Sequence, residues 1–215
     1  EALEAGGDMY ISIGKNIEII NTRFTGSSAL EGSFLYAEEI DETLVVKNAQ
    51  ITDISSTNTD AYILTVSSGL MIITDSVFEN IFSPLFLISN ATTSINNVTF
   101  NQISCPRSSN SFCFLKATSS NSIKITNSSL TNINSNVNLI SLSACTEVLF
   151  SNVLAQNLLK VTQDSDQMFI LNALKVQSLQ ISESNFIKIG FSGIKGKDSS
   201  LLVQNTPFSN KIETT

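Results

Sequence analysis

Residues 123–133 read IKITNSSLTNI, and this stretch decides the fold of the chain because related stretches recur along its whole length. Up to Asn127, every second residue of this stretch is apolar. Further apolar residues follow three and six positions after Asn127. The related stretches, in chain order, are IEIINTRF, LVVKNAQITDI, MIITDSVFENI, SINNVTFNQI, VLFSNVLAQNL, LQISESNFIKI and LLVQNTPFSNK. A unit that repeats every few tens of residues is typical of a solenoid.

The polar residue in the middle of each repeat marks a common position, which we call the anchor. The eight anchors are Asn21, Asn48, Asp75, Asn97, Asn127, Asn152, Glu183 and Asn205. Successive anchors are 27, 27, 22, 30, 25, 31 and 22 residues apart, and no helical periodicity lies between them. A repeat of this length fits one coil of three short strands joined by three turns.

Apolar residues alternate with others before each anchor, as at Ile123 and Ile125, which is typical of a strand with one buried face. Continued alternation predicts that the anchor side chain points inward at a bend. Because a buried amide must be hydrogen-bonded, we expect a ladder of amides from coil to coil. Its members are Asn21, Asn48, Asn97, Asn127, Asn152 and Asn205. Asp75 and Glu183 would interrupt the ladder, so we expect them to turn outward or find a donor, in coils that are locally irregular.

Two more strands complete each coil. The strand after the anchor is expected to place one large apolar residue inward in seven of the eight repeats, with Ala155 as the small exception; these residues are Phe24, Ile51, Phe78, Phe100, Leu130, Phe186 and Phe208. The strand upstream of each repeat is expected at residues 9–13, 33–37, 61–66, 84–88, 112–116, 138–142 and 168–172, and the last coil has only GFSGIKG there.

The sequence therefore predicts an all-β, right-handed, single-stranded parallel β-helix of about eight coils, each with three short strands. We expect residues 1–215 to form a single β-helix domain that is a segment of a longer chain or of an assembly.

The repeat with asparagine at its turn resembles the right-handed parallel β-helix repeats of the pectin-lyase-like superfamily. In addition, GGDMYI at residues 6–11 and NTRFTGSSA at residues 21–29 are similar to the GGA-I and F-x-x-N repeats of polymorphic outer-membrane proteins and related adhesin-like surface proteins. Asp8 departs from the GGA-I motif, and the Gly-Gly pair does not recur in later coils. The first resemblance implies the fold, and the second implies a role at a cell surface.

The composition limits the classes of partner that this protein is expected to bind. Apolar residues make up 42% of the chain and charged residues only 14%, with a net charge of −7. Arg23 and Arg107 are the only arginines, so the clustered positive charge of a nucleic-acid surface is missing. No apolar run is long enough to cross a bilayer. We expect an extracellular or cell-surface protein whose partners are other copies of itself or flanking solenoid coils, with glycans as a further class.

Three cysteines and three glycosylation sequons bear on the cellular compartment in which the chain folds. Cys105 and Cys113 are predicted to form a local disulfide, the alternative being two reduced buried thiols, while Cys145 is expected to pack as a small apolar residue. The sequons begin at Asn90, Asn97 and Asn127. Asn97 and Asn127 are anchors expected to point inward, so Asn90 is the predicted glycan site.

The sequence argues against an enzyme. Hydrolysis of a polysaccharide on this fold requires paired carboxylates in one cleft, commonly with a histidine, and the chain has no histidine. Elimination requires a calcium-binding carboxylate cluster beside a basic residue, but neither arginine lies among acids. The acidic groups at 38–42 and 164–166 are interpreted as solvated turns rather than calcium sites. We therefore expect no catalytic residue, no cofactor and no metal.

Two functions remain in view. The first is a non-enzymatic extracellular solenoid that acts as a surface rod, an adhesin-like module or a filament subunit that stacks end to end. The second is a carbohydrate-binding or polysaccharide-degrading β-helix protein. Aromatic side chains would favour sugar binding, but tryptophan is absent and Tyr10, Tyr36 and Tyr62 all fall in corresponding strands, where they are expected to form a column in the core.

Overall fold

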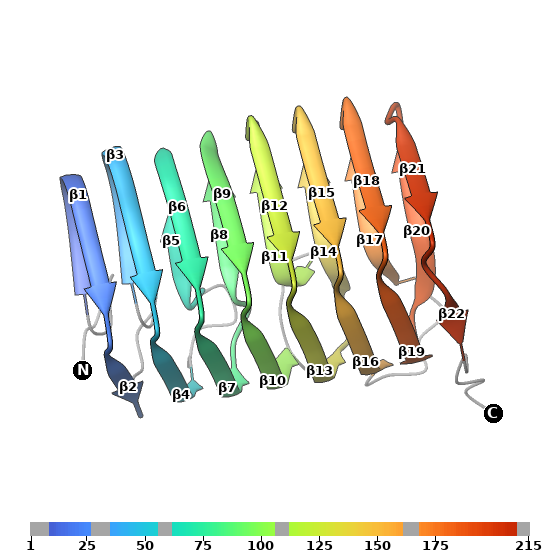
Figure 1. The fold of residues 1–215 in the computed structure, drawn as a ribbon, viewed down its shortest axis with the longest axis horizontal. Helices are drawn as coiled ribbons and strands as arrows, with labels where there is room; N and C mark the ends of the chain where they lie inside the picture. Colours follow the sequence, from blue (N-terminus) through green and yellow to red (C-terminus); the bar gives the residue numbers. More distant parts are fainter. Residues whose placement is uncertain (1–8, 27–34, 56–61, 106–111, 161–167, 210–215) are drawn as a thin grey trace.

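A computed structural model describes residues 9–26, 35–55, 62–105, 112–160 and 168–209 (Figure 1). These residues form parallel β-strands and no helix. The chain advances from left to right in Figure 1, while the strands in front run downward and those behind them run upward. This winding is right-handed, and the predicted all-β parallel β-helix is confirmed.

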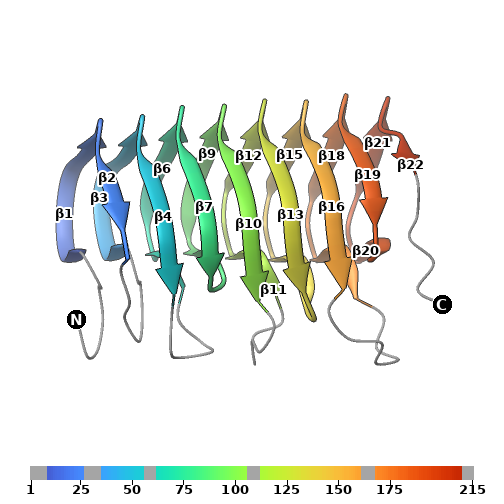
Figure 2. The same cartoon turned by 90° about the horizontal axis from the view of Figure 1, so that it is seen from below.

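The strands lie on three faces of the solenoid (Figures 1 and 2). The first face contains β5 (Leu64–Val66), β8 (Phe86–Ser89), β11 (Phe112–Thr118), β14 (Asn138–Ser143), β17 (Phe169–Leu174) and β20 (Ser192–Lys197). The second face contains β6 (Gly69–Thr74), β9 (Ala91–Asn96), β12 (Ser122–Thr126), β15 (Glu147–Ser151), β18 (Ser178–Ser182) and β21 (Leu201–Gln204). The long strands β1 (Met9–Ile20) and β3 (Leu35–Lys47) run through both faces and join them into one sheet, which has 14 strands in the part of the chain that the structure describes.

Within the described ranges, the third face is a separate sheet of eight strands, one from each repeat. Its strands are β2 (Arg23–Thr25), β4 (Gln50–Ser55), β7 (Val77–Phe82), β10 (Thr99–Cys105), β13 (Ser129–Ser135), β16 (Leu154–Lys160), β19 (Asn185–Ile189) and β22 (Phe208–Ser209). Pairing is in register between equivalent residues of neighbouring repeats, as where Phe100 pairs with Phe78 and Leu130. The expected upstream strands are present, and even the last coil supplies one, β20.

Residues with positive φ form the bends of the coils. All eight anchors have φ between 48° and 54° and connect the second face to the third, at what we call the anchor corner. A second series lies five residues after the anchors, and a third connects the first face to the second at Asn90, Ser119, Ala144, Lys175 and Asp198. Asparagine is common in these series because it tolerates the left-handed conformation better than most residues.

The connection between the first and second faces at Gly69 requires glycine. Its φ is +80°, and a Cβ placed there would lie 2.2 Å from the carbonyl oxygen of Ile40 in the preceding coil. Beside it, the Ile40 amide donates a hydrogen bond of 3.0 Å to the hydroxyl of Ser68. The two coils therefore approach too closely here for any side chain.

The expectation that anchor side chains point inward is wrong. All eight are exposed, and the residue that follows each anchor turns inward instead. The left-handed residue interrupts the strand alternation, so inward and outward positions exchange across the bend. Asp75 and Glu183 also do not make their coils irregular: their φ values, 52° and 49°, match those of the asparagines, and their amides bond to the next coil in the same way.

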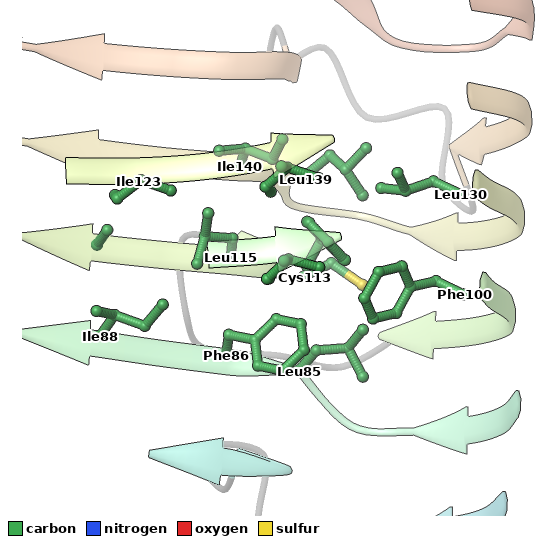
Figure 3. Packing of buried hydrophobic residues seen from close by; sticks show 14 of the residues in the cluster. Leu85, Phe86, Ile88, Phe100, Cys113, Leu115, Ile123, Leu130, Leu139 and Ile140 are labelled. Atoms are coloured by element: carbon green, nitrogen blue, oxygen red, sulfur yellow. The ribbon is translucent and has the colours of Figure 1, made fainter. Parts of the chain in front are cut away.

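The core fills the interior between the three faces (Figure 3). The predicted column three residues after the anchors is confirmed, with Phe78 and Phe100 stacked at 5.2 Å between ring centroids and fully buried. Phe86 and Phe114 from the first face meet Phe100 edge to face at 5.8 and 4.8 Å. Such aromatic pairs stabilise the core beyond the burial of their area alone. Ala155 interrupts the column, and an apolar cavity of about 20 Å³ lies beside it.

Candidate functional site: the anchor corner

The anchor corner is the most regular polar feature of the surface. Each coil contributes the end of a strand on the second face, an exposed anchor and the start of a strand on the third face. The anchor amide donates to a carbonyl of the following coil, as from Asn48 to Thr74 and from Asn127 to Ser151, both at 3.1 Å. The backbone thus fixes the anchors one above another along the solenoid.

The anchor side chains form a surface ladder in short runs. Asn48 donates to Asn21 at 2.7 Å, and Asn152 donates to Asn127 at 2.8 Å, in each case from Nδ2 to Oδ1. Asn97 donates to the carboxylate of Asp75 at 2.7 Å, so an acidic anchor serves as an acceptor rather than an interruption.

The side-chain hydrogen bonds do not link every anchor directly to the anchor of the neighbouring coil. Asn127 donates at 2.8 Å to Asn96, the residue before the neighbouring anchor Asn97. Asn205 and Glu183 are exposed in the same conformation, but in the described part of the chain their side chains have no hydrogen-bonded partner. The structure therefore places all six predicted ladder asparagines at one corner and links five of them by side-chain hydrogen bonds.

A column of buried hydroxyls lies directly beneath the anchors. The Ser128 hydroxyl donates to the Thr126 carbonyl at 2.7 Å and accepts from the Val98 amide of the preceding coil at 3.2 Å. Ser76 and Ser184 make the same pair of bonds, and all three serines are at most 4% exposed. These serines, which lie in alternate coils, are the buried polar groups of this corner, and each bonds to backbone groups of its own coil and of the preceding one.

A second amide series lies five residues after the anchors. Asn157 donates to Asn132 at 3.0 Å, Asn132 donates to Asn101 at 2.8 Å, and Asn80 donates to Asp53. Neither this series nor the hydroxyl column was predicted from the sequence. Both leave a signal there, because Asn or Asp recurs five positions after the anchor and Ser or Thr recurs directly after it.

A shallow groove of about 360 Å³ runs along the anchor corner over four coils. Its walls are the anchors on one side and residues of the third face on the other, and its base is formed by the residues after the anchors. The lining residues are Asn97, Val98, Thr99, Asn127, Ser128, Ser129, Asn152, Val153, Leu154, Glu183 and Asn185. Glu183 is the only titratable group among them, so the groove offers hydrogen bonds but no pair of acids or acid and base.

The sequence predicted that the asparagines of the three sequons differ in whether their side chains point inward or outward, and they do not differ in this way. Asn90, Asn97 and Asn127 are all exposed with positive φ, so the inward placement of the latter two is wrong. They differ in what their side-chain amides do: Nδ2 of Asn97 and of Asn127 donates across coils, whereas Nδ2 of Asn90 donates, among the described residues, only to the neighbouring Ser89 hydroxyl at 3.2 Å. Asn90 remains the predicted glycan site for this reason.

The cysteines lie in the core. Cys105 and Cys113 are joined by a disulfide with their Cα atoms 5.7 Å apart. Cys145 is a buried free thiol whose Sγ lies 3.5 Å from the Ser143 carbonyl. Burial raises the pKa of the Cys145 thiol, although hydrogen bonds with the backbone of Ser120 and Ser143 act in the opposite direction. The thiol is therefore held in its protonated, unreactive form.

The remaining candidates are the acidic residues that were considered as calcium ligands. Asp41 and Glu42 are exposed, and Glu42 accepts from Asn16 at 2.6 Å, while the side chains at 38–39 and the whole of 164–166 lie outside the described residues. No three His, Cys, Asp or Glu side chains in the described ranges could hold one metal ion.

Three further expectations concern the arginines, the tyrosines and a membrane-spanning helix. Arg23 is exposed, Arg107 lies outside the described residues, and so do the side chains of Tyr10 and Tyr36. Tyr62 is half-buried and stacks on Phe112 with ring centroids 5.4 Å apart. Within the described ranges, no helix has the length and hydrophobicity needed to span a membrane.

No protein-family model, curated protein sequence or solved structure matches this chain.

Proposed function

We propose that this protein is a non-enzymatic structural and interaction module: an extracellular or cell-surface rod, of the kind seen in adhesin-like surface proteins and filament subunits. Its repeat resembles that of the pectin-lyase-like superfamily in fold, but the proposal does not carry over the chemistry of those enzymes. The rod would hold other domains apart or present its surface to partners.

One observation carries the proposal: the regular polar side chains of the surface bond to one another from coil to coil. Asn21 with Asn48, Asn127 with Asn152, and Asn132 with Asn157 are pairs of equivalent residues in neighbouring coils. They reinforce the stacking of coils, which is the property that a rod requires.

Two features support an extracellular location. The Cys105–Cys113 disulfide is of a kind that persists in oxidising compartments. Asn90 is exposed at a corner where a glycan would displace no hydrogen bond between coils. Intact-mass measurement of protein isolated from its native source is expected to show one disulfide, and glycopeptide analysis is expected to find Asn90 occupied more fully than Asn127. Free Cys105 and Cys113 in that protein would contradict the location.

The absence of enzymatic activity is tested directly on polysaccharides. Purified protein is incubated with acidic and neutral polysaccharides, with and without added calcium, and the products are measured as new reducing ends and as the ultraviolet absorbance of unsaturated sugars. We expect neither signal above that of protein unfolded before the assay. Cleavage that the unfolded control lacks would overturn the proposal in favour of a polysaccharide-degrading enzyme.

The groove along the anchor corner favours carbohydrate binding as a second candidate function. Coils are about 4.8 Å apart, so an extended polyhydroxylated chain lying in the groove would meet the polar side chain of an anchor at each coil. Ser129 lines the groove without taking part in the ladder, and Asn134 lies on the same strand outside the groove. Binding on a glycan array that Ser129→Lys abolishes and Asn134→Lys preserves would establish this candidate; binding that survives both would reject the groove.

A further inference from the structure

Hydrogen bonds between side chains join neighbouring coils over the first six coils of the solenoid. We number the coils by their anchors, so that coil 1 contains Asn21 and coil 8 contains Asn205. Every junction from coils 1 and 2 to coils 5 and 6 has at least one such bond, for example from Asn48 to Asn21 and from Asn152 to Asn127. These bonds add to the backbone pairing that stacks one coil on the next.

The junction between coils 6 and 7 lacks these bonds in the described ranges. Glu183 follows Asn152 in the anchor series, and Lys188 follows Asn157 in the second series, all four with positive φ. Asn152 and Asn157 each donate to the equivalent asparagine of coil 5. Neither is hydrogen-bonded to the side chain of its successor in coil 7, so both amide series are interrupted at the same junction.

Backbone pairing across this junction is also shorter on the third face. Among the described residues, β16 pairs with β13 of coil 5 as far as Lys160, but with β19 of coil 7 only as far as Leu158. Two side chains still support the pairing by accepting from backbone amides of the other coil, the Ser184 hydroxyl at 3.1 Å and Oδ1 of Asn138 at 2.8 Å. The coils therefore remain in register here with fewer bonds.

The core has a cavity at the same place. Ala155 pairs with Leu130 of coil 5 and Phe186 of coil 7, and the apolar cavity of about 20 Å³ lies beside it. Ring contacts among four phenylalanines interlock coils 3, 4 and 5. Coils 7 and 8 are joined by the stacked rings of Phe186 and Phe208, 4.6 Å apart. In the described part of the chain, no ring contact crosses from coil 6 to coil 7.

These features decide where the solenoid separates most easily. The stability of a solenoid is approximately the sum of terms for its coils and for the interfaces between neighbours, so partial opening occurs at the weakest interface. A cavity removes packing contacts from the residues around it, and the interrupted series remove hydrogen bonds. Coils 7 and 8, in contrast, are further held together by Lys195, whose Nζ lies 5.2 Å from the centroid of the Phe169 ring.

We propose that the solenoid opens at the junction between coils 6 and 7, so that coils 7 and 8 unfold as one unit while coils 1–6 stay folded. Opening uncovers inward residues of coil 6, such as Val153 and Leu158, together with the edges of β14, β15 and β16. This opening follows from junctions inside the solenoid alone. A rod that bears tension would extend coils 7 and 8 first; that consequence, unlike the opening itself, rests on the proposed function.

Equivalent backbone amides report on each junction. Two residues after the anchors, the amides of Ser129, Leu154 and Asn185 donate to the preceding coil at 3.0, 3.0 and 2.8 Å. Hydrogen exchange of the 215-residue chain is measured in low concentrations of urea and corrected for intrinsic rates. We expect Asn185 to exchange at least about tenfold faster than Leu154, with Ser129 close to Leu154. Phe186, whose amide donates to Pro207 of coil 8, should share the urea dependence of Asn185.

Stabilising substitutions in the two parts of the solenoid should act differently. Thr93→Val in coil 4 stabilises coils that are folded in both the native and the partly open state, so it should slow exchange at Leu154 and leave Asn185 unchanged. Glu183→Asn restores an amide opposite Asn152 and acts on the native state alone, so it should slow exchange at Leu154 and Asn185 by the same factor. Exchange that rises smoothly along the chain without a step, or a Thr93→Val variant that slows both amides alike, would overturn the opening at this junction.

A pair of asparagine substitutions tests the contact across the junction itself. The factor by which Glu183→Asn slows exchange should fall when Asn152 is replaced by glycine, which adopts the left-handed conformation without offering an acceptor. Lys175→Asn is the matched control, because Lys175 has a φ of 55° in the same coil but adjoins Ala144 in coil 6. Its effect should not depend on Asn152, and equal dependence of both substitutions would contradict the interrupted ladder as a cause of the opening. The rod without enzymatic activity would survive any of these results, because its own test is the polysaccharide assay; cleavage in that assay would leave the exchange result standing.

Discussion

The anchor Asn127 allows the two contributions of an anchor, its hydrogen bonds and its left-handed conformation, to be separated by substitution. Its side chain makes two hydrogen bonds across coils, to Asn96 and from Asn152, and its φ is 49°. Exposed amide bonds contribute about 0.5 kcal/mol each, and the left-handed conformation costs a residue with a Cβ about 1–2 kcal/mol. Asn127→Ala should therefore lower the free energy of unfolding by about 2–3 kcal/mol.

Glycine at the same position loses the hydrogen bonds but adopts the left-handed conformation without strain. Its greater freedom in the unfolded chain costs about 0.5–1 kcal/mol, so Asn127→Gly should lose about 1.5–2 kcal/mol and be less damaging than Asn127→Ala. Asn134 is exposed on the neighbouring strand with ordinary strand dihedral angles, and there the order should reverse, with glycine worse than alanine.

Urea-induced unfolding, followed by circular dichroism, measures these differences. With an unfolding slope on the order of 2–3 kcal/mol per molar urea for a chain of this size, Asn127→Ala should shift the midpoint down by about 1 M. Asn134→Ala should stay within about 0.5 kcal/mol of the unmodified protein. The reasoning is refuted if alanine and glycine rank in the same order at both positions, or if Asn127→Ala costs no more than Asn134→Ala.

Three other substitutions or conditions test the interior. Ser128→Ala should destabilise the protein by about 1–3 kcal/mol, because it leaves the Val98 amide buried without its acceptor; a loss below about 0.5 kcal/mol in urea unfolding would contradict the role of the hydroxyl column. Thr93→Val should do the opposite and stabilise by about 1 kcal/mol, since the Thr93 hydroxyl is 1% exposed without a hydrogen-bond partner in the described residues; a lower urea midpoint would show that the hydroxyl has a partner. Cys145 should react with a thiol reagent only on unfolding, and because its folded pKa is raised, the stability that its thiol contributes should be full below the ordinary thiol pKa and decline as the pH rises above it; Cys145→Ala should show a smaller decline, and an equal decline in both proteins would assign the pH dependence to other groups.

The repeat made most of the fold predictable. Alternating apolar residues before Asn127 and the apolar residue three positions after it are enough to predict strands, their buried faces and the phenylalanine column that Phe78 and Phe100 share. These features are local in origin, because a strand of period two presents one face whatever its neighbours are. In-register stacking then follows because the strands on either side of the anchor lie at the same offsets in each repeat, although successive anchors are 22 to 31 residues apart.

The candidate site was less predictable. The anchors were correctly predicted to lie at a turn, but their side chains were predicted to point into the core, whereas they point toward solvent. One residue with positive φ exchanges inward and outward positions, and extrapolating the strand alternation through the bend ignores that exchange. For the same reason the sequence directed attention to Asn127 as the buried polar group when Ser128 is the one that is buried.

What the sequence by itself determined is the coil: its length, its three strands, its apolar interior and the residue type at its bends. What only the tertiary structure decided is which polar groups meet between coils. Hydrophobic periodicity arises within one strand and can be read from consecutive residues. Hydrogen bonds such as that between Asn127 and Asn96 join residues about one coil apart in the sequence, and only the stacked coils bring those residues together.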